Sequence, residues 1–432
     1  MMTPMNSKWT GRPVRFIYRA TQLYLIALLL SGQWAIASDT VPAQYFGLHM
    51  HRSDSGTRWP ATPFGAWRLW DASVAWPNLQ PSSEAWDLRR LDLYLAMARL
   101  KDVEILLPLG LTPTWASSRP NEKSAYEAGN AAEPRDIKLW RRYVEAIARR
   151  YKGRISAYEI WNEPDQSGFF SGDVNMMVRL TCEAYAMVKG VDPAALMVSP
   201  AATLQKQGIR WLDVFLSTGG ARCIDVVGFH FYTLAHEPPE AITELASELT
   251  RVLRKHGLQD KPVWNTESGW YIQNKRVPIN TRWHILSPDT AAAYVSRALV
   301  LAWVAGIRRF YWYAWDNGNY GLIEPDTGEL KSSAVAYRRT ANWMIGSTIS
   351  ECIRPGNKVF VCPVVREGRK GWIVWRESGE DKFAVPSQWG VTDVEGITND
   401  QTSPIETKRG LMVIGEMPVL LKTSADTWGR AK

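Results

Sequence analysis

The chain has 432 residues, of which 46% are hydrophobic, so it can bury a large core and form one large domain with a smaller one. Its formal net charge is +8, but four basic residues precede residue 38 without any acid, and the rest carries only +4. Charges of both signs are interspersed and there is no basic run, so a nucleic-acid partner is not expected.

The first 37 residues have the layout of an export signal. A basic stretch precedes the apolar run 23–30, and Ala35-Ile-Ala37 fits a small-x-small cleavage site before Ser38. The apolar run is short for a comfortable membrane span. We therefore expect a cleaved signal peptide, with an uncleaved anchor in the inner membrane as the alternative. Either outcome predicts a periplasmic or secreted protein.

Residues 38–346 alternate between short apolar, β-prone segments and helical segments. Eight such units over about 300 residues predict a closed parallel (β/α)8 barrel, or TIM barrel. The predicted strands cover 44–51, 65–71, 103–109, 157–161, 195–199, 224–232, 261–267 and 308–315. The predicted helices cover 83–101, 135–151, 174–189, 209–216, 239–256, 288–304 and 332–345.

The pattern changes in residues 347–432, where short β-like stretches are separated by turns. This change predicts a small antiparallel β-sandwich as an accessory domain. Because no low-complexity linker precedes it, we expect it to pack rigidly on the barrel, as a brace more than as a sugar binder. The predicted strands cover 359–365, 371–375, 383–386, 391–396 and 417–421.

Four cysteines are present, and export would make disulfides accessible to them. Cys352 and Cys362 are close in sequence and flank a β-like stretch, which predicts a local bridge. Cys182 and Cys223 allow a second bridge, with a pair of buried free thiols as the alternative. No cysteine spacing resembles a zinc site.

Two glutamates end predicted barrel strands. The stretch 157–164 reads AYEIWNEP, in which Pro164 ends the strand directly after Glu163. The stretch beginning at Pro262 again runs as an apolar strand into Glu267 and then into turn residues. The carboxyl ends of the strands form the active-site face of a barrel, and a carboxyl pair there is what glycoside hydrolysis needs. We assign Glu163 as the acid/base and Glu267 as the nucleophile; ordinary solvated loop glutamates are the alternative.

Supporting polar residues fall at other strand ends. Arg68 can keep the nucleophile ionised, since a nearby cation lowers the pKa of a carboxyl group. Asn162 can donate its amide to a sugar hydroxyl. His230 and Tyr232 share one face of an extended segment, so His230 can orient Glu163 or touch a sugar, and Tyr232 can hydrogen-bond Glu267. A rim salt bridge for Arg68 and a structural role for His230 are the alternatives.

Aromatic and histidine side chains complete the predicted sugar site. His49 and His51 share a face of the first strand and are expected to line it; because no third ligand is suggested, no metal is expected. The chain has 22 tryptophans, whose flat faces can stack on sugar rings or simply build the core. Trp115 and Trp315 are the candidate stacking platforms, with core packing as the alternative.

These residues resemble the pattern of retaining glycosidases of clan GH-A. Within the clan, F-G-x-H at 46–49 and T-P-x-W at 112–115 resemble glycoside hydrolase family thirty-nine. The signal-bearing layout and short β tail resemble PslG-type endoglycosidases from bacterial exopolysaccharide loci. The resemblance implies a retaining mechanism, a barrel with an accessory β-sandwich, and no cofactor.

The sequence therefore predicts an exported retaining glycoside hydrolase, a monomer, that acts within chains of a bacterial exopolysaccharide. Its expected partner is a polysaccharide or oligosaccharide substrate. An exo-acting, β-xylosidase-like enzyme is the nearest alternative. A non-catalytic glycan-binding subunit of a polysaccharide export complex is a further one, against which the glutamate pair argues.

Overall fold

The computed structural model describes residues 40–423, except 235, 357, 399–401 and 405–409. The predicted signal segment and cleavage site lie outside these residues. The described residues belong to one compact unit. Among the helices of the described part, none is long and apolar enough to cross a membrane.

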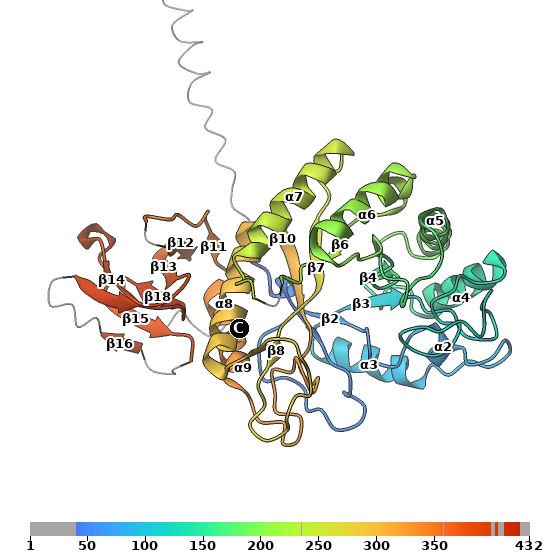
Figure 1. The fold of residues 1–432 in the computed structure, drawn as a ribbon, viewed down its shortest axis with the longest axis horizontal. Coiled ribbons are helices and arrows are strands. Elements are labelled where there is room, and N and C mark those ends of the chain that lie inside the picture. The colour runs from blue at the N-terminus through green and yellow to red at the C-terminus, as the bar shows by residue number, and fades with distance from the viewer. Residues whose placement is uncertain (1–39, 235, 357, 399–401, 405–409, 424–432) are drawn as a thin grey trace, which may run out of the picture. The chain divides into compact units, whose positions relative to one another are not determined.

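The described chain contains the predicted barrel (Figure 1). Its sheet has eight parallel strands in the order β5-β4-β3-β2-β1-β10-β7-β6. The edge strands β5 and β6 meet through a parallel bridge from Val198 to Val226, which nearly closes the ring. The strands are β1 (Phe46–His49), β2 (Ala66–Arg68), β3 (Glu104–Leu109), β4 (Ala157–Ile160), β5 (Leu196–Val198), β6 (Val227–His230), β7 (Val263–Ser268) and β10 (Ile307–Trp312).

Helices between the strands cover the outside of the barrel. They are α2 (Trp76–Leu79), α3 (Arg89–Leu100), α4 (Ile137–Arg150), α5 (Val174–Val191), α6 (Gln205–Ser217), α7 (Ala241–Lys255), α8 (Pro288–Val304) and α9 (Ser332–Met344). The helix predicted over 83–101 begins only at Arg89, so the prediction was wrong for residues 83–88. Asp87 accepts the backbone N–H of Arg89 on its side chain, and such local bonds compete with helix formation.

The barrel interior is apolar below the strand ends. Successive side chains of a strand point to opposite faces of the sheet. Seven residues that point into the barrel therefore form a buried cluster of their own, separate from the main core. The outward faces join the helices in the main core. The inward cluster consists of Ala66, Leu106, Ala157, Val198, Val226, Trp264 and Tyr311.

The C-terminal region forms two antiparallel sheets that face each other, which confirms the predicted sandwich. One has the order β11-β12-β13-β18-β15-β16, and the other pairs β14 with β17. Val361, Trp372 and Val374 pack between them against Phe383 and Ile414. The strands are β11 (Thr348–Ile349), β12 (Val359–Arg366), β13 (Arg369–Arg376), β14 (Asp381–Ala384), β15 (Asp393–Gly396), β16 (Thr402–Pro404), β17 (Leu411–Ile414) and β18 (Val419–Lys422).

The sequence missed several short strands. β11, β16 and β17 of the C-terminal region were not predicted, nor was the pair β8 (Tyr271–Ile272) and β9 (Ile285–Leu286) within the barrel loops. β8, β9 and β11 have two residues each, and β16 has three. Strands this short give no alternation to read, and only their partners define them.

The other face of the larger sheet packs on the barrel. Phe360, Ile373 and Trp375 belong to the same core cluster as the barrel helices. A buried ion pair joins Arg297 of α8 to Glu240 at the start of α7, and the indole N–H of Trp375 donates to Glu240 at 2.9 Å. These contacts make the accessory region part of the barrel's core.

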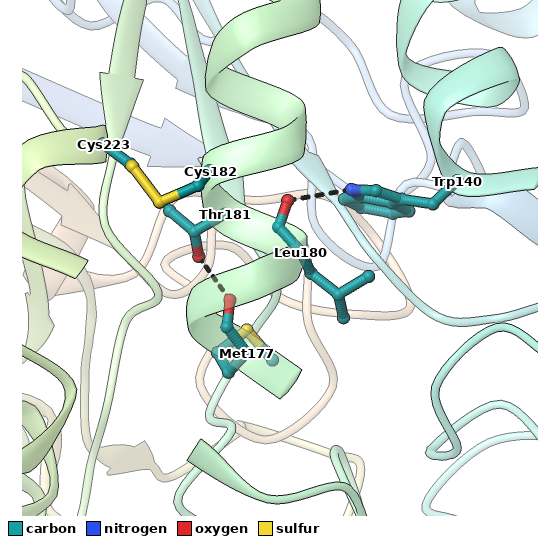
Figure 2. The surroundings of a disulfide bond; sticks show 6 residues. All are labelled: Trp140, Met177, Leu180, Thr181, Cys182 and Cys223. Atoms are coloured by element: carbon teal, nitrogen blue, oxygen red, sulfur yellow. Dashed lines mark hydrogen bonds between the residues drawn. A yellow bond between two sulfur atoms is a disulfide. The ribbon is translucent and has the colours of Figure 1, made fainter. Parts of the chain in front are cut away.

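Both cysteine pairs are joined as disulfides. The local bridge links Cys352 to Cys362. The second links Cys182 of α5 to Cys223, so the free-thiol alternative was wrong (Figure 2). In the same helix, the carbonyl of Leu180 accepts the indole N–H of Trp140 from α4. The bridge and this hydrogen bond lie on the outer helical layer.

Candidate active site

The backbone bends sharply where β4 ends, and this bend presents Glu163. Trp161 and Glu163 have positive φ angles of 63° and 45°, which is uncommon for residues other than glycine. Between them, Asn162 forms an isolated parallel β-bridge with Ala201, which follows β5. This bridge fixes the bend to the neighbouring strand. Pro164 follows and prevents a return to the ladder. Conformations of this kind are concentrated at functional sites.

Glu267 lies at the corresponding end of β7, where the strand pairing is irregular. It is paired with His230 after a register shift in the β6–β7 ladder, and the β7–β10 ladder shifts at the same level. Such irregularities re-aim side chains next to active sites. Both carboxyl groups are largely buried, with Glu163 8% and Glu267 7% exposed.

The two glutamates approach each other closely. One carboxylate oxygen of Glu163, one of Glu267 and a ring nitrogen of His230 all lie within 4.8 Å of one another. Nδ1 of His230 is 3.0 Å from Oε1 of Glu163. Residues from β4, β6 and β7, up to 104 positions apart in the chain, therefore form one cluster.

Arg68 of β2 organises the cluster. It is fully buried and divides its donors among three acceptors. Its Nη1 donates to Glu267 at 2.9 Å, its Nη2 to Asn162 at 2.7 Å, and its Nε to Glu159 at 2.6 Å. The predicted contact between Arg68 and the nucleophile is therefore present, and the rim salt bridge proposed as its alternative was wrong.

The second oxygen of Glu267 has its own donor. The hydroxyl of Tyr232 donates to Oε1 at 3.0 Å, as the sequence predicted. Glu163 instead accepts from the amide of Gln166 at 2.6 Å. Arg68 and Tyr232 therefore donate to both carboxylate oxygens of Glu267. In Glu163, Oε1 instead lies next to Nδ1 of His230.

Burial sets the protonation of the site. It raises the pKa of Glu163 to about 7 and that of Glu267 to about 7, because a charged carboxylate is disfavoured away from water. Burial lowers the pKa of His230 to about 4, so its imidazole is neutral at pH 7. Arg68 and Tyr232 both stabilise the ionised form of Glu267. When Glu163 and Glu267 together carry one proton, that proton is therefore on Glu163.

The predicted histidines line the same site. His49 is fully buried, and its Nε2 is 3.0 Å from the carbonyl of Thr266 on β7. Nδ1 of His49, Nε2 of His51 and Nε2 of His230 have no hydrogen-bond partner in the described part of the protein. Buried polar atoms are normally satisfied, so these three unpaired nitrogens are an exception.

The two predicted tryptophan platforms are mostly occupied by packing contacts within the protein. Trp115 donates its indole N–H to the carbonyl of Gln80 and contacts Trp76 edge-on, among the outer helices. Trp315 is 3% exposed and belongs to the main core. The aromatic ring beside the histidines is Tyr313, whose centroid is 5.1 Å from those of His49 and His51.

Sequence reasoning missed several residues of the site, including Gln166, which donates to Glu163. Glu159 is fully buried and bound to Arg68; an acid on the inward face of an apolar strand, two residues from Ala157, was a readable signal. Asp71 ended the predicted strand 65–71, which was a readable signal too, whereas Tyr126 and Tyr313 gave none. The two tyrosine hydroxyls each donate to Asp71 at 2.6 Å, and only the fold brings these three loops together.

The trio Glu163, His230 and Glu267 is the one group with metal-ligand spacing among the described residues. Its carboxylate oxygens are already hydrogen-bonded by Arg68, Tyr232 and Gln166. Arg68 supplies the positive charge that a cation would bring. The donor set thus fits acid/base and nucleophilic chemistry better than metal binding.

Comparison with known proteins points to the same chemistry. Residues 139–318 match the family described as "Glycosyl hydrolase catalytic core", and this span includes both glutamates. No curated protein sequence matches the chain.

Solved glycosidases share the fold at low sequence identity. A GH39 β-xylosidase from Caulobacter crescentus superimposes with a TM-score of 0.64 at 17% identity, over 89% of this chain and 97% of that one. A glucosidase from Croceicoccus marinus gives a TM-score of 0.61 at 15% sequence identity, and a GH51 arabinofuranosidase from Xanthomonas axonopodis pv. citri gives a TM-score of 0.59 at 12% identity. Both superpositions again cover 89% of this chain and 97% of the other. The (β/α)8 barrel and the match of residues 139–318 to the glycosyl hydrolase family identify the chain as a glycosidase.

Proposed function

We propose that the chain is an exported, retaining glycoside hydrolase that cleaves internal bonds of a bacterial exopolysaccharide. One observation carries the retaining mechanism: oxygens of Glu163 and Glu267 lie within 4.8 Å of each other. Retaining enzymes hold their carboxyl groups about 5–5.5 Å apart, whereas inverting enzymes need roughly 6.5–9.5 Å to admit a water molecule.

The contacts give each glutamate a role. Glu267, oriented by Arg68 and Tyr232, attacks the anomeric carbon while Glu163 gives its proton to the departing oxygen. The glycosidic bond breaks and a glycosyl ester forms on Glu267. Glu163, now ionised, takes a proton from water, and this water displaces Glu267 from the sugar. Neutral His230 remains against Glu163 through both steps.

Two features support export. Disulfides persist in oxidising compartments, and the chain holds two. The N-terminal sequence adds the basic and apolar layout of a signal. We propose a periplasmic or secreted location, with or without an N-terminal membrane anchor.

The endo-acting assignment is supported by the sequence resemblance to PslG-type enzymes. A second candidate is an exo-acting β-xylosidase, favoured by the likeness to the Caulobacter β-xylosidase, of which 97% is covered. Two solved GH30 xylanases also share the fold, at 13% identity, so fold likeness is compatible with either mode.

Incubation with the polysaccharide of the protein's own host tests the function. We expect a rapid fall in chain length with few new reducing ends, abolished in Glu267→Gln because the nucleophile is lost. Release of small sugars alone would replace endo with exo action. Glycan binding without new ends, unchanged in the variant, would support a non-catalytic subunit and overturn the proposal.

A further inference from the structure

A third carboxylate, Asp71, lies three residues after Arg68, the side chain that binds Glu267. It follows β2 in a left-handed conformation, with a φ of 55°, and its side chain is partly exposed. Burial is the main cause of the raised pKa values of Glu163 and Glu267, and the charge of Asp71 adds to the rise in both. The reaction described above assigns it no proton and no bond.

Two tyrosines hold this carboxylate in place. Tyr126, from the loop after β3, donates to Oδ1, and Tyr313, directly after β10, donates to Oδ2, both at 2.6 Å. The backbone N–H of Tyr313 in turn donates to Ser268, the neighbour of Glu267, at 2.9 Å. Asp71 is therefore connected to the wall of the catalytic cluster and is not a free surface group.

Each oxygen of Asp71 retains accepting capacity, because a carboxylate offers about four lone-pair positions and the tyrosines use two. Asp71 can therefore accept further hydrogen bonds from a sugar hydroxyl or an ammonium group. It cannot accept one from a second carboxylate at neutral pH.

Arg68 and the two fully buried histidines of the site, His49 and His230, do not offset this charge. The guanidinium of Arg68 is taken up by Glu159, Glu267 and Asn162. Burial keeps the pKa values of His49 and His230 low, so both are neutral at pH 7. The carboxylates around the reacting position therefore outnumber the positive charges.

From this arrangement we infer that Asp71 is a specificity-determining residue that admits neutral or amino-bearing sugars and rejects uronates beside the catalytic glutamates. The inference rests on the proposed function and names its substrate class. A carboxylate on the sugar, several Å from Asp71, would meet like-charge repulsion of the size that lowers binding about tenfold or more.

The test uses two forms of one polymer. The host polysaccharide is compared with the same material after its charge is changed, by oxidising primary hydroxyls to carboxylates or, if it is acidic, by reducing its carboxylates. Linkages and backbone sugars then match, and only the charge differs. We expect the unmodified enzyme to show a kcat/KM at least about tenfold higher on the uncharged form.

Asp71→Asn should bring this ratio close to one, because the amide keeps the shape and loses the charge. Asp54→Asn is the matched control: Asp54 also accepts from a tyrosine, Tyr94, but pairs with Arg90 outside the site, so the ratio should not change. If Asp71→Asn does not fold, high ionic strength should shrink the ratio of the unmodified enzyme by screening.

The outcomes separate the two proposals. Equal or faster cleavage of the carboxylated form by the unmodified enzyme overturns the role of Asp71 but leaves the hydrolase in place. An unchanged ratio in Asp71→Asn does the same. Cleavage of neither form would overturn the proposed function, and the inference with it.

Discussion

Two fully buried arginines, Arg68 and Arg297, show how the same side chain serves different ends. Arg297 directs Nε and Nη2 to the two oxygens of a single carboxylate, Glu240, whose Oε1 also accepts from Trp375. Arg68 instead spreads its donors over Glu159, Glu267 and Asn162.

The difference is geometric. A guanidinium that binds one carboxylate bidentately holds it in a fixed geometry. Nη2 of Arg297 also donates to the carbonyl of Glu377, directly after β13, which suits the contact between α8 and the C-terminal sheet. A guanidinium shared among acceptors from β4 and β7 sets the positions of those strand ends relative to one another. Arg68 therefore orients reacting groups, whereas Arg297 joins parts of the core.

Replacing each arginine by methionine should separate these roles. In Arg68→Met we expect kcat/KM to fall about 100-fold or more, because small misplacements of reacting groups are costly. We also expect the free energy of unfolding to fall by about 3–5 kcal/mol, since Glu159 loses its partner. Arg297→Met should lose a similar free energy of unfolding but keep kcat/KM within about twofold.

Denaturant unfolding and initial rates, measured well below the unfolding transition, check both variants. A comparable loss of activity in folded Arg297→Met would contradict the separation. Arg68→Lys adds a control, because it retains the charge but not the fork, and only partial recovery of activity is expected.

The disulfides extend the comparison to the outer layers. Removing Cys182 and Cys223 together opens a loop of 41 residues and should lower the free energy of unfolding by about 4 kcal/mol. Cys352 and Cys362 are only 10 residues apart, so removing them should lower it by about 3 kcal/mol. Neither pair contacts the glutamates, so kcat/KM should stay unchanged at 25 °C. Thermal unfolding with and without a reductant measures the effect, and a drop in kcat/KM of the folded variants would link these layers to the site.

The smallest expected effect concerns pH. Because the pKa values of Glu163 and Glu267 are both about 7, the productive form with one proton on the pair should peak near pH 7. kcat/KM should fall on the acidic side as Glu267 becomes protonated, and on the basic side as Glu163 loses its proton. Rates on an aryl glycoside across pH 5–9 measure the profile.

Glu163→Gln is the control for the fall in kcat/KM at high pH. With an aryl glycoside whose leaving group needs no protonation, this variant should no longer show that fall. It should also affect stability in a defined direction. The folded pKa of Glu163 is raised, so its contribution to stability is present at low pH and lost as pH rises through about 7. The variant should therefore unfold at a higher temperature than the unmodified protein at pH 8, but not at pH 4. An identical shift at both pH values would contradict the raised pKa.

The sequence predicted the order of elements well because barrel strands are short apolar runs ended by recognisable residues. Pro164 marked the end of β4, and the eight predicted strands all correspond to strands of the barrel. Boundaries were less accurate. The helix placed over 83–101 begins at Arg89, where a side-chain contact replaces the first turn.

By itself, the sequence determined the barrel class, the two glutamates at strand ends four and seven, and three residues that contact them, Arg68, His230 and Tyr232. It could do so because strand position alone assigns a side chain to the carboxyl edge. Only the tertiary structure decided that Tyr313 lies beside the histidines, that Trp315 belongs to the core, and that Asp71 joins Tyr126 to Tyr313. The reason is physical: these residues lie on loops beyond the strands, where no periodicity fixes direction and only long-range packing brings distant segments together.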